Sequence, residues 1–147
     1  MGNRHRAREI AVKLLYQHEA SGESAEKILE GFFVGHPVNG DTKAFAEDFV
    51  AGTIQNIEEI DSLLCQASDN WSLKRILPVD LSILRLASFE LLYLGTAPAV
   101  AIDEAVRLAK HFSSEKASPF INGVLDKIKE MSQNRTTRDP LVSGEQA

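Results

Sequence analysis

The sequence has a single cysteine, Cys65, among its 147 residues, so no disulfide can form within the chain. Such sparing use of cysteine suits a reducing compartment, and we expect a cytoplasmic location. No apolar run approaches the ~20 residues that a membrane-spanning helix needs, and the charged first eight residues do not resemble a signal peptide. Cys65 itself lies in an apolar helical pattern, which favours a buried small side chain over a reactive thiolate.

The sequence also lacks the usual sets of catalytic and metal-binding residues. The four histidines have no metal-ligand spacing, and the nine glycines stand singly rather than in a phosphate-binding loop. Acidic pairs such as Glu58-Glu59 and Asp103-Glu104 are adjacent in sequence, so their side chains diverge on a helix. We therefore predict no metal site, no cofactor and no enzymatic activity.

Charge is distributed unevenly along the chain. The formal net charge is −5, yet residues 1–16 carry a net +3 from three arginines and one lysine against one glutamate. Residues 41–69 instead hold seven acidic side chains and one lysine. An acidic body with a short basic N-terminal segment favours local contact with a polyanion over a generally basic binding face.

The most apolar stretch covers residues 80–94 and predicts a helix that has no polar face and therefore lies inside the fold. Gly95 follows it as a left-handed stop. Arg85 and Glu90 are the charged residues in the body of this helix. We expect each to be paired inside the fold, because an unpaired buried charge costs several kcal/mol.

Apolar residues at a period of 3.6 predict further helices, and no alternating β pattern is present. The predicted class is all-α, with about seven helices in two small bundles that share the central helix. Residues 1–131 are expected to form one domain, and the polar residues 132–147 a disordered tail. The other predicted helices cover residues 4–20, 24–33, 42–67 with a break near Asn56, 71–77 as a short helix or bridge, 102–112 and 118–131.

The basic N-terminal segment is the first candidate binding site. Arg4 and Arg8 are one helical turn apart, with Arg6 between them, so their guanidinium groups could contact successive phosphates. Three arginines near an N-terminus are equally compatible with a solvated helix end. Tyr16 lies outside the apolar stripe of this helix, and either touches a second helix or is exposed beside the basic segment.

The second candidate is SSEKASPFINGVL, residues 113–125. Phe120 falls outside the apolar stripe of its helix, so it is either a core residue or, near Lys116, a stacking platform for an unpaired base. Asn122 either satisfies a neighbouring backbone group or reads a base edge. Gly123 in mid-helix costs ~1 kcal/mol relative to alanine, which indicates the close approach of another helix.

Three segments together resemble the bacterial NusB family of transcription antitermination factors. The resemblance runs from Arg4 to about Lys129 and is weakest over residues 22–73. It implies an all-helical fold of two perpendicular bundles. The segments are RAREIAVKLLY at 6–16, RILPVDLSILRLASFELL at 75–92 and AVAIDEAVRLAKHFSSEKASPFINGVLDKI at 99–128.

The resemblance also implies a function. It implies joint binding of the boxA element of nascent RNA with NusE, a small-subunit ribosomal protein, and indirect association with RNA polymerase, chiefly in ribosomal RNA operons. NusE is expected to bind around the start of the central helix, with Tyr16 near the meeting point of RNA and protein, and with Asp80 and Arg75 as further contacts. The expected RNA-binding residues are Arg4, His5, Arg6, Arg8, Tyr16, Lys116, Phe120 and Asn122.

One departure and one alternative accompany this resemblance. Asp103 stands where the family usually has asparagine, so an amide-dependent contact is not implied at that position. The alternative is a protein-only helical module that self-associates through its central region and covers the RNA surface. Some relatives form homodimers, and the sequence does not distinguish the two possibilities.

Overall fold

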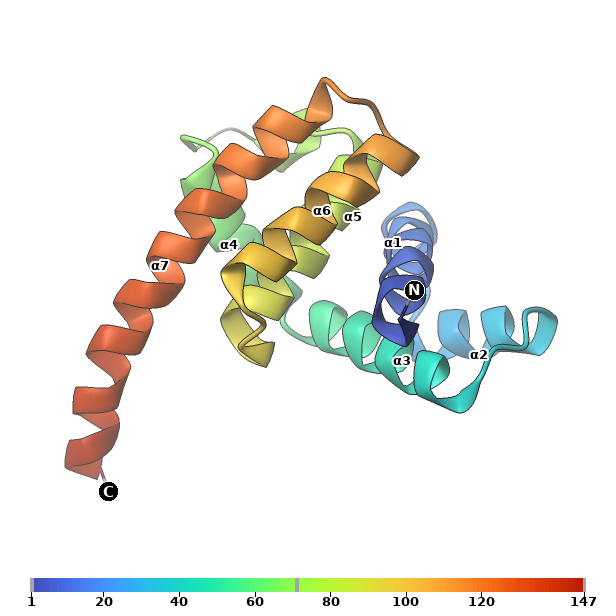
Figure 1. Cartoon of the computed structure of the whole chain (residues 1–147), viewed down its shortest axis with the longest axis horizontal. Coiled ribbons are helices and arrows are strands. Elements are labelled where there is room, and N and C mark those ends of the chain that lie inside the picture. Colours follow the sequence, from blue (N-terminus) through green and yellow to red (C-terminus); the bar gives the residue numbers. More distant parts are fainter. Residues whose placement is uncertain (1, 71, 147) are drawn as a thin grey trace.

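The computed structural model describes the backbone of residues 2–70 and 72–146, and the side chains as far as residue 134. Within these ranges the chain forms helices and no strand (Figure 1), which confirms the predicted all-α class. None of the described helices has the length and apolar character needed to cross a membrane. The elements are α1 (Asn3–Ser21), α2 (Ala25–Gly35), α3 (Gly40–Gln55), α4 (Ile57–Ala67), the 3₁₀ turn η1 (Leu73–Arg75), α5 (Pro78–Phe89), the π-helical turn η2 (Glu90–Leu94), α6 (Pro98–Phe112) and α7 (Ala117–Gln146).

The helices form two bundles that run in clearly different directions (Figure 1). In the first bundle α1 and α2 pack against α3, and in the second α4, α6 and α7 gather around α5. Because α5 also contacts α1 and α3, it belongs to both bundles, and residues 80–91 are all buried. The predicted pair of perpendicular bundles with a shared central helix is thereby confirmed.

Local sequence explains where these helices begin and end. Gly22 ends α1 with φ 74° and Gly95 ends η2 with φ 67°, both in the left-handed region that favours glycine. Ser24 and Asn39 precede α2 and α3, and their side-chain oxygens accept hydrogen bonds from backbone N–H groups of the first turn. The predicted break near Asn56 is confirmed, because α3 ends before it and α4 begins after it.

One helix crossing depends on a missing side chain. Gly52 of α3 lies against Phe89 of α5, and a Cβ built on Gly52 would lie only 2.1 Å from the ring carbon Cζ. Glycine is therefore what allows these two helices to approach. The close approach predicted at Gly123 is wrong, because no neighbouring atom lies within 4 Å of the position its Cβ would take.

Helix α7 continues past the second bundle and carries the polar end of the chain away from the core (Figure 1). The sequence predicted that the polar residues 132–147 form a disordered tail. The side chains from residue 135 onward lie outside the described residues. The disorder of the tail and the domain limit at residue 131 therefore stay predictions.

Candidate RNA and protein interface

Arg8 is buried inside the protein, with 5% of its surface exposed. Its Nε and Nη2 atoms donate hydrogen bonds to the two carboxylate oxygens of Glu90 at 2.8 and 2.7 Å, and its Nη1 donates to Glu104 at 3.0 Å. Glu90 is 2% exposed and also accepts a hydrogen bond from Thr96 Oγ1 at 3.1 Å. All three nitrogens of the Arg8 guanidinium are thus engaged within the fold.

The surroundings of Arg8 keep it charged. Burial alone would lower the pKa of Arg8, but the hydrogen bonds and the attraction of Glu90 and Glu104 outweigh burial and raise that pKa above its ordinary value. The RNA-binding role of Arg8 stays a prediction, but a direct contact with phosphate from the surface does not fit a guanidinium that is 5% exposed and held in a bidentate pair.

Arg85 forms a second internal charge network, in the middle of α5. Its Nε and Nη2 donate to the carboxylate of Asp61, both at 2.8 Å, and its Nη1 donates to Glu19 at 2.6 Å. Burial alone would lower the pKa of Arg85, but the hydrogen bonds that it donates to Asp61 and Glu19, together with their attraction, prevail and raise that pKa. The prediction that Arg85 and Glu90 are paired inside the fold is confirmed.

The rest of the arginine segment remains near the surface. Arg4 and Arg6 are exposed at the start of α1, and Arg6 approaches Glu9 only at 3.7 Å. His5 is half-buried between two acids, with its Nδ1 3.1 Å from Glu104 and its Nε2 3.6 Å from Glu9. Two of the three arginines thus have charges that a polyanion can reach.

A hollow of about 470 Å³ opens where α1 meets the start of α5 and the end of α6. Tyr16 is 47% exposed there and Leu77 is 62% exposed. Lys13 lies over the Phe112 ring, with its Nζ 5.9 Å from the ring centre. Of the two possibilities that the sequence left open for Tyr16, the structure shows the exposed one. This Tyr16 hollow is lined by Val12, Lys13, Tyr16, Leu77, Pro78, Val79 and Phe112.

Asp80 does not offer a free surface carboxylate beside this hollow. It is 6% exposed in the first turn of α5, and its Oδ1 has no hydrogen-bond partner among the described residues. Arg75 is exposed at the end of η1. The partner-binding roles of both residues stay predictions, and for Asp80 a direct surface ion pair does not fit its burial.

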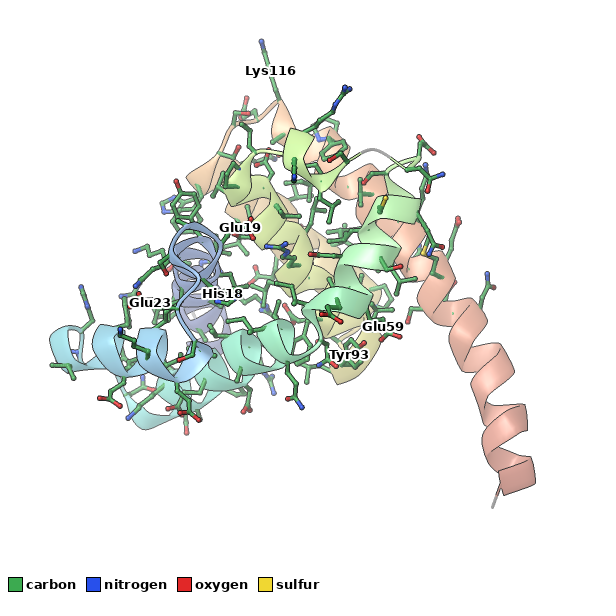
Figure 2. The ribbon with its side chains drawn as sticks, turned by 180° about the vertical axis from the view of Figure 1, so that it is seen from behind. His18, Glu19, Glu23, Glu59, Tyr93 and Lys116 are labelled. Carbon is green, nitrogen blue, oxygen red and sulfur yellow. The ribbon has the colours of Figure 1, made fainter. Side chains whose placement is uncertain are left out.

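The candidates near the start of α7 point into different hollows. Phe120 is 39% exposed and lines a hollow of about 390 Å³ between the end of α4 and α7. Asn122 lines another hollow, between α6 and α7, where it donates a hydrogen bond to Asp126 at 3.1 Å. Asp103 and Lys129 border the same hollow, so charges of both signs surround Asn122. Lys116 projects from the turn between α6 and α7 (Figure 2).

The predicted residues therefore do not form one pocket. Tyr16 is grouped with the start of α5, whereas Phe120 lines a hollow that shares no residue with the Tyr16 hollow. Arg4 and Arg8 border a third hollow, where the Arg4 guanidinium carbon lies 4.8 Å from the centre of the Phe45 ring. A ligand that touches all of them would have to extend across several helices.

Comparisons with known proteins agree with this fold along most of the chain. The profile of the NusB family matches residues 5–130. The chain belongs to the NusB family. The transcription antitermination protein NusB of Sorangium cellulosum is 39% identical over 140 residues, which are 95% of this chain and 99% of that protein. The NusB of Geobacter sulfurreducens is 42% identical over 130 residues, 87% and 94% of the two chains. These matches confirm the prediction that the protein is a transcription antitermination factor and not an enzyme.

Solved NusB structures share the two-bundle architecture. T. maritima NusB superposes with a TM-score of 0.78 at 36% identity, covering 86% of this chain and 90% of that one. A chain from a crystal structure of the antitermination factors NusB and NusE in complex with dsRNA superposes with a TM-score of 0.82 at 31% identity, covering 89% and 98%. The NusB fold is thus present over nearly the whole length of these relatives.

Sequence reasoning missed most of the apolar lining of the Tyr16 hollow in this NusB-family chain. Leu77, Pro78 and Val79 directly precede or begin α5, so they belong to no periodic stripe. Three apolar residues in a row just before the predicted central helix could have indicated an exposed apolar surface at this point. Phe112 is the last residue of the helix predicted over residues 102–112, and the structure places it at the border between core and hollow.

Proposed function

We propose that this protein binds the boxA element of nascent ribosomal RNA operon transcripts together with NusE, and so brings the pair to RNA polymerase. The observation that carries this proposal is the exposed apolar Tyr16 hollow on α1, the helix whose first two turns carry the exposed Arg4 and Arg6. The family assignment and the likeness to a NusB chain solved with NusE and dsRNA support it.

The Tyr16 hollow has the character of a protein-docking surface. Tyr16 and Leu77 expose large apolar areas at one place, which is unusual unless a partner covers them. Exposed aromatic residues in a partly formed pocket are also the usual anchors of protein interfaces. We assign this hollow to NusE, with Tyr16 at the edge that faces the RNA.

The RNA contact rests on fewer charges than the sequence suggested. With Arg8 held inside the fold, Arg4 and Arg6 are the available arginines, and Lys13 and Lys116 continue the basic character toward the start of α7. The two phosphate contacts of Arg4 and Arg6 to single-stranded RNA contribute about −1.4 to the slope of log K against log salt. Such weak electrostatic binding makes the protein depend on NusE for tight association with boxA.

Replacing Arg4 and Arg6 with alanine tests the RNA contact. Affinity of the NusE complex for a labelled boxA oligonucleotide should fall most in low salt, and the salt slope should become shallower by about 1.4. A matched control is the Lys27→Ala/Arg107→Ala variant, which removes two positive charges from exposed pairs elsewhere. If both variants behave alike, the start of α1 is not the RNA-binding segment.

Replacing Leu77 with aspartate tests the protein contact. Because Leu77 is largely exposed, this variant should keep its fold but bind NusE at least about tenfold more weakly, since a charge would enter an apolar interface. The Val34→Asp variant, at an exposed valine on α2, should bind NusE normally. Light scattering without NusE tests the alternative function: a homodimer that becomes a monomer in Leu77→Asp would assign the Tyr16 hollow to self-association.

A further inference from the structure

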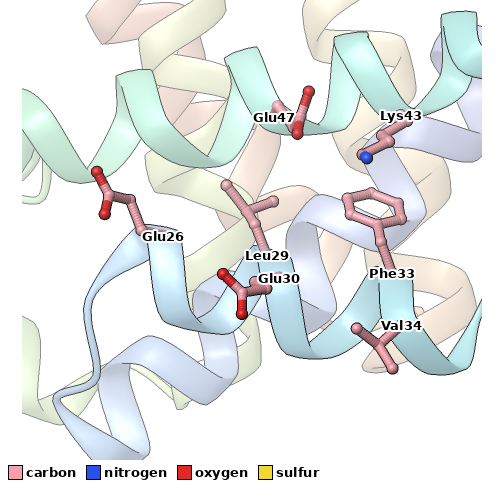
Figure 3. Close-up of a pocket in the computed structure, with 7 residues that line it drawn as sticks. All are labelled: Glu26, Leu29, Glu30, Phe33, Val34, Lys43 and Glu47. Carbon is pink, nitrogen blue, oxygen red and sulfur yellow. The ribbon is translucent and has the colours of Figure 1, made fainter.

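Helices α2 and α3 border a separate hollow of about 530 Å³ (Figure 3). Leu29 and Phe33 reach from α2 toward α3, where Lys43 and Glu47 lie (Figure 3). None of the residues that line this hollow also lines the Tyr16 hollow. The α2–α3 hollow is lined by Glu26, Leu29, Glu30, Phe33, Val34, Lys43 and Glu47.

The apolar part of this hollow is incompletely covered by the fold. Helix α2 is rich in apolar residues, yet only Ile28 and Leu29 are buried. Val34 is 82% exposed, and Phe33 is half-buried with the Lys43 Nζ 5.6 Å from the centre of its ring. An apolar helix face that the protein itself leaves open is a common feature of interaction surfaces.

The charged border of the hollow selects the kind of partner. Glu26, Glu30 and Glu47 form no ion pair or hydrogen bond with any described side chain. Residues 23–48 carry six acidic side chains and two lysines. Unpaired carboxylates around an apolar floor repel RNA phosphates and attract lysine and arginine, so the complementary ligand is a basic protein segment with apolar residues on one side.

We propose that the α2–α3 hollow docks a basic amphipathic helix of a partner protein. Apolar residues at i, i+3, i+4 and i+7 of that helix would cover Phe33 and Val34, and its flanking lysines or arginines would pair with the three glutamates. The contact leaves Arg4, Arg6 and the Tyr16 hollow free. This second protein contact goes beyond the proposed function and does not depend on it.

A synthetic peptide with the chemistry of such a helix tests the proposal. The probe carries leucine at the i, i+3, i+4 and i+7 positions and lysine elsewhere, and the same peptide with glutamate for lysine is the charge control. Titration followed by amide NMR should shift resonances around residues 26–34 and 43–47. The glutamate peptide should cause no such shifts.

Charge reversal on the protein supplies the matched controls. Glu26→Lys/Glu30→Lys should weaken the lysine peptide about tenfold or more, measured by fluorescence anisotropy. The Glu58→Lys/Glu115→Lys variant changes the net charge equally at exposed positions outside the hollow and should stay within about twofold of the original protein. Val34→Asp should also weaken binding, while its circular dichroism spectrum stays unchanged.

Several results would overturn the proposal. Equal losses in the two charge-reversal variants would mean general attraction to an acidic protein rather than a site. Amide shifts elsewhere, or no binding of the lysine peptide, would also refute it. If light scattering shows a dimer that Glu26→Lys/Glu30→Lys converts to a monomer, the occupant is a second copy of the chain and the proposal fails. We expect Glu26→Lys/Glu30→Lys and Val34→Asp to bind boxA and NusE normally. A failure of the α2–α3 docking proposal can then be distinguished from a failure of the proposed boxA and NusE function.

Discussion

The assignment of Arg8 to the interior predicts a large stability loss when it is replaced. An Arg8→Met variant leaves Glu90, which is 2% exposed, as an uncompensated buried charge; among the described side chains the Thr96 hydroxyl then remains as its hydrogen-bond donor. Breaking one side of such a pair costs about 3–5 kcal/mol of unfolding free energy, several times the value of a surface ion pair. Urea unfolding followed by far-UV circular dichroism measures this difference directly.

A second substitution separates the lost pair from the lost side-chain volume. In Arg8→Met/Glu90→Met the buried charge is gone and both side chains keep apolar bulk, so most of the stability should return. The coupling free energy from the resulting double-mutant cycle should be several kcal/mol and favourable to the pair. A cost below about 1 kcal/mol for Arg8→Met alone would refute the view that this guanidinium is structural.

The same double variant distinguishes folding from RNA binding. If Arg8 acts only inside the fold, the refolded Arg8→Met/Glu90→Met protein should bind boxA with NusE as the original does. Arg4→Ala/Arg6→Ala should lose affinity while keeping normal stability, because both side chains are exposed. A double variant that folds normally but no longer binds RNA would instead return Arg8 to the RNA-binding set.

Three further predictions use paired positions. Gly52→Ala should lower the unfolding free energy by about 1–3 kcal/mol or more, since its Cβ would meet the Phe89 ring. Gly123→Ala has open space around it and should raise the unfolding free energy by up to about 1 kcal/mol in the same urea assay. Arg85→Met should cost about 1–3 kcal/mol, less than Arg8→Met, because its partners Glu19 and Asp61 are partly solvated; equal costs would contradict this order. Phe120→Ala should weaken boxA binding by about 1–3 kcal/mol if a base stacks on the ring. Asn122→Ala should leave that binding unchanged, because the Asn122 amide already donates to Asp126 in a different hollow; the reverse result in a boxA titration would move the contact to Asn122.

The helices could be predicted because their signals are local. Ala7, Ile10 and Leu14 recur at the helical period, and all three are buried on one side of α1. The central segment was predicted as one helix over residues 80–94, and the chain is helical throughout. Its last turn is a π-helical turn from Glu90 to Leu94, which the apolar pattern cannot distinguish from an α-helix.

The candidate site was harder to predict because burial of a charge depends on distant residues. Arg8 looks like a surface arginine in its own segment, and its partners lie 82 and 96 positions further along the chain. Asp80 looks like an exposed acid for the same reason. The apolar surplus of α2 is visible in the sequence, but only the packing of α2 on α3 shows that Val34 stays exposed and Phe33 half-buried.

The long-range ties of Arg8 also set an order of events during translation. A ribosome that adds about 5–20 residues per second needs roughly 5–20 s to advance the 96 positions from Arg8 to Glu104. Until Glu90 and Glu104 have been synthesised, the Arg8 guanidinium lacks the partners that bury it and remains a hydrated cation of the nascent chain. Completion of α6 withdraws that cation, so the electrostatic surface of the N-terminus reaches its final form late in synthesis.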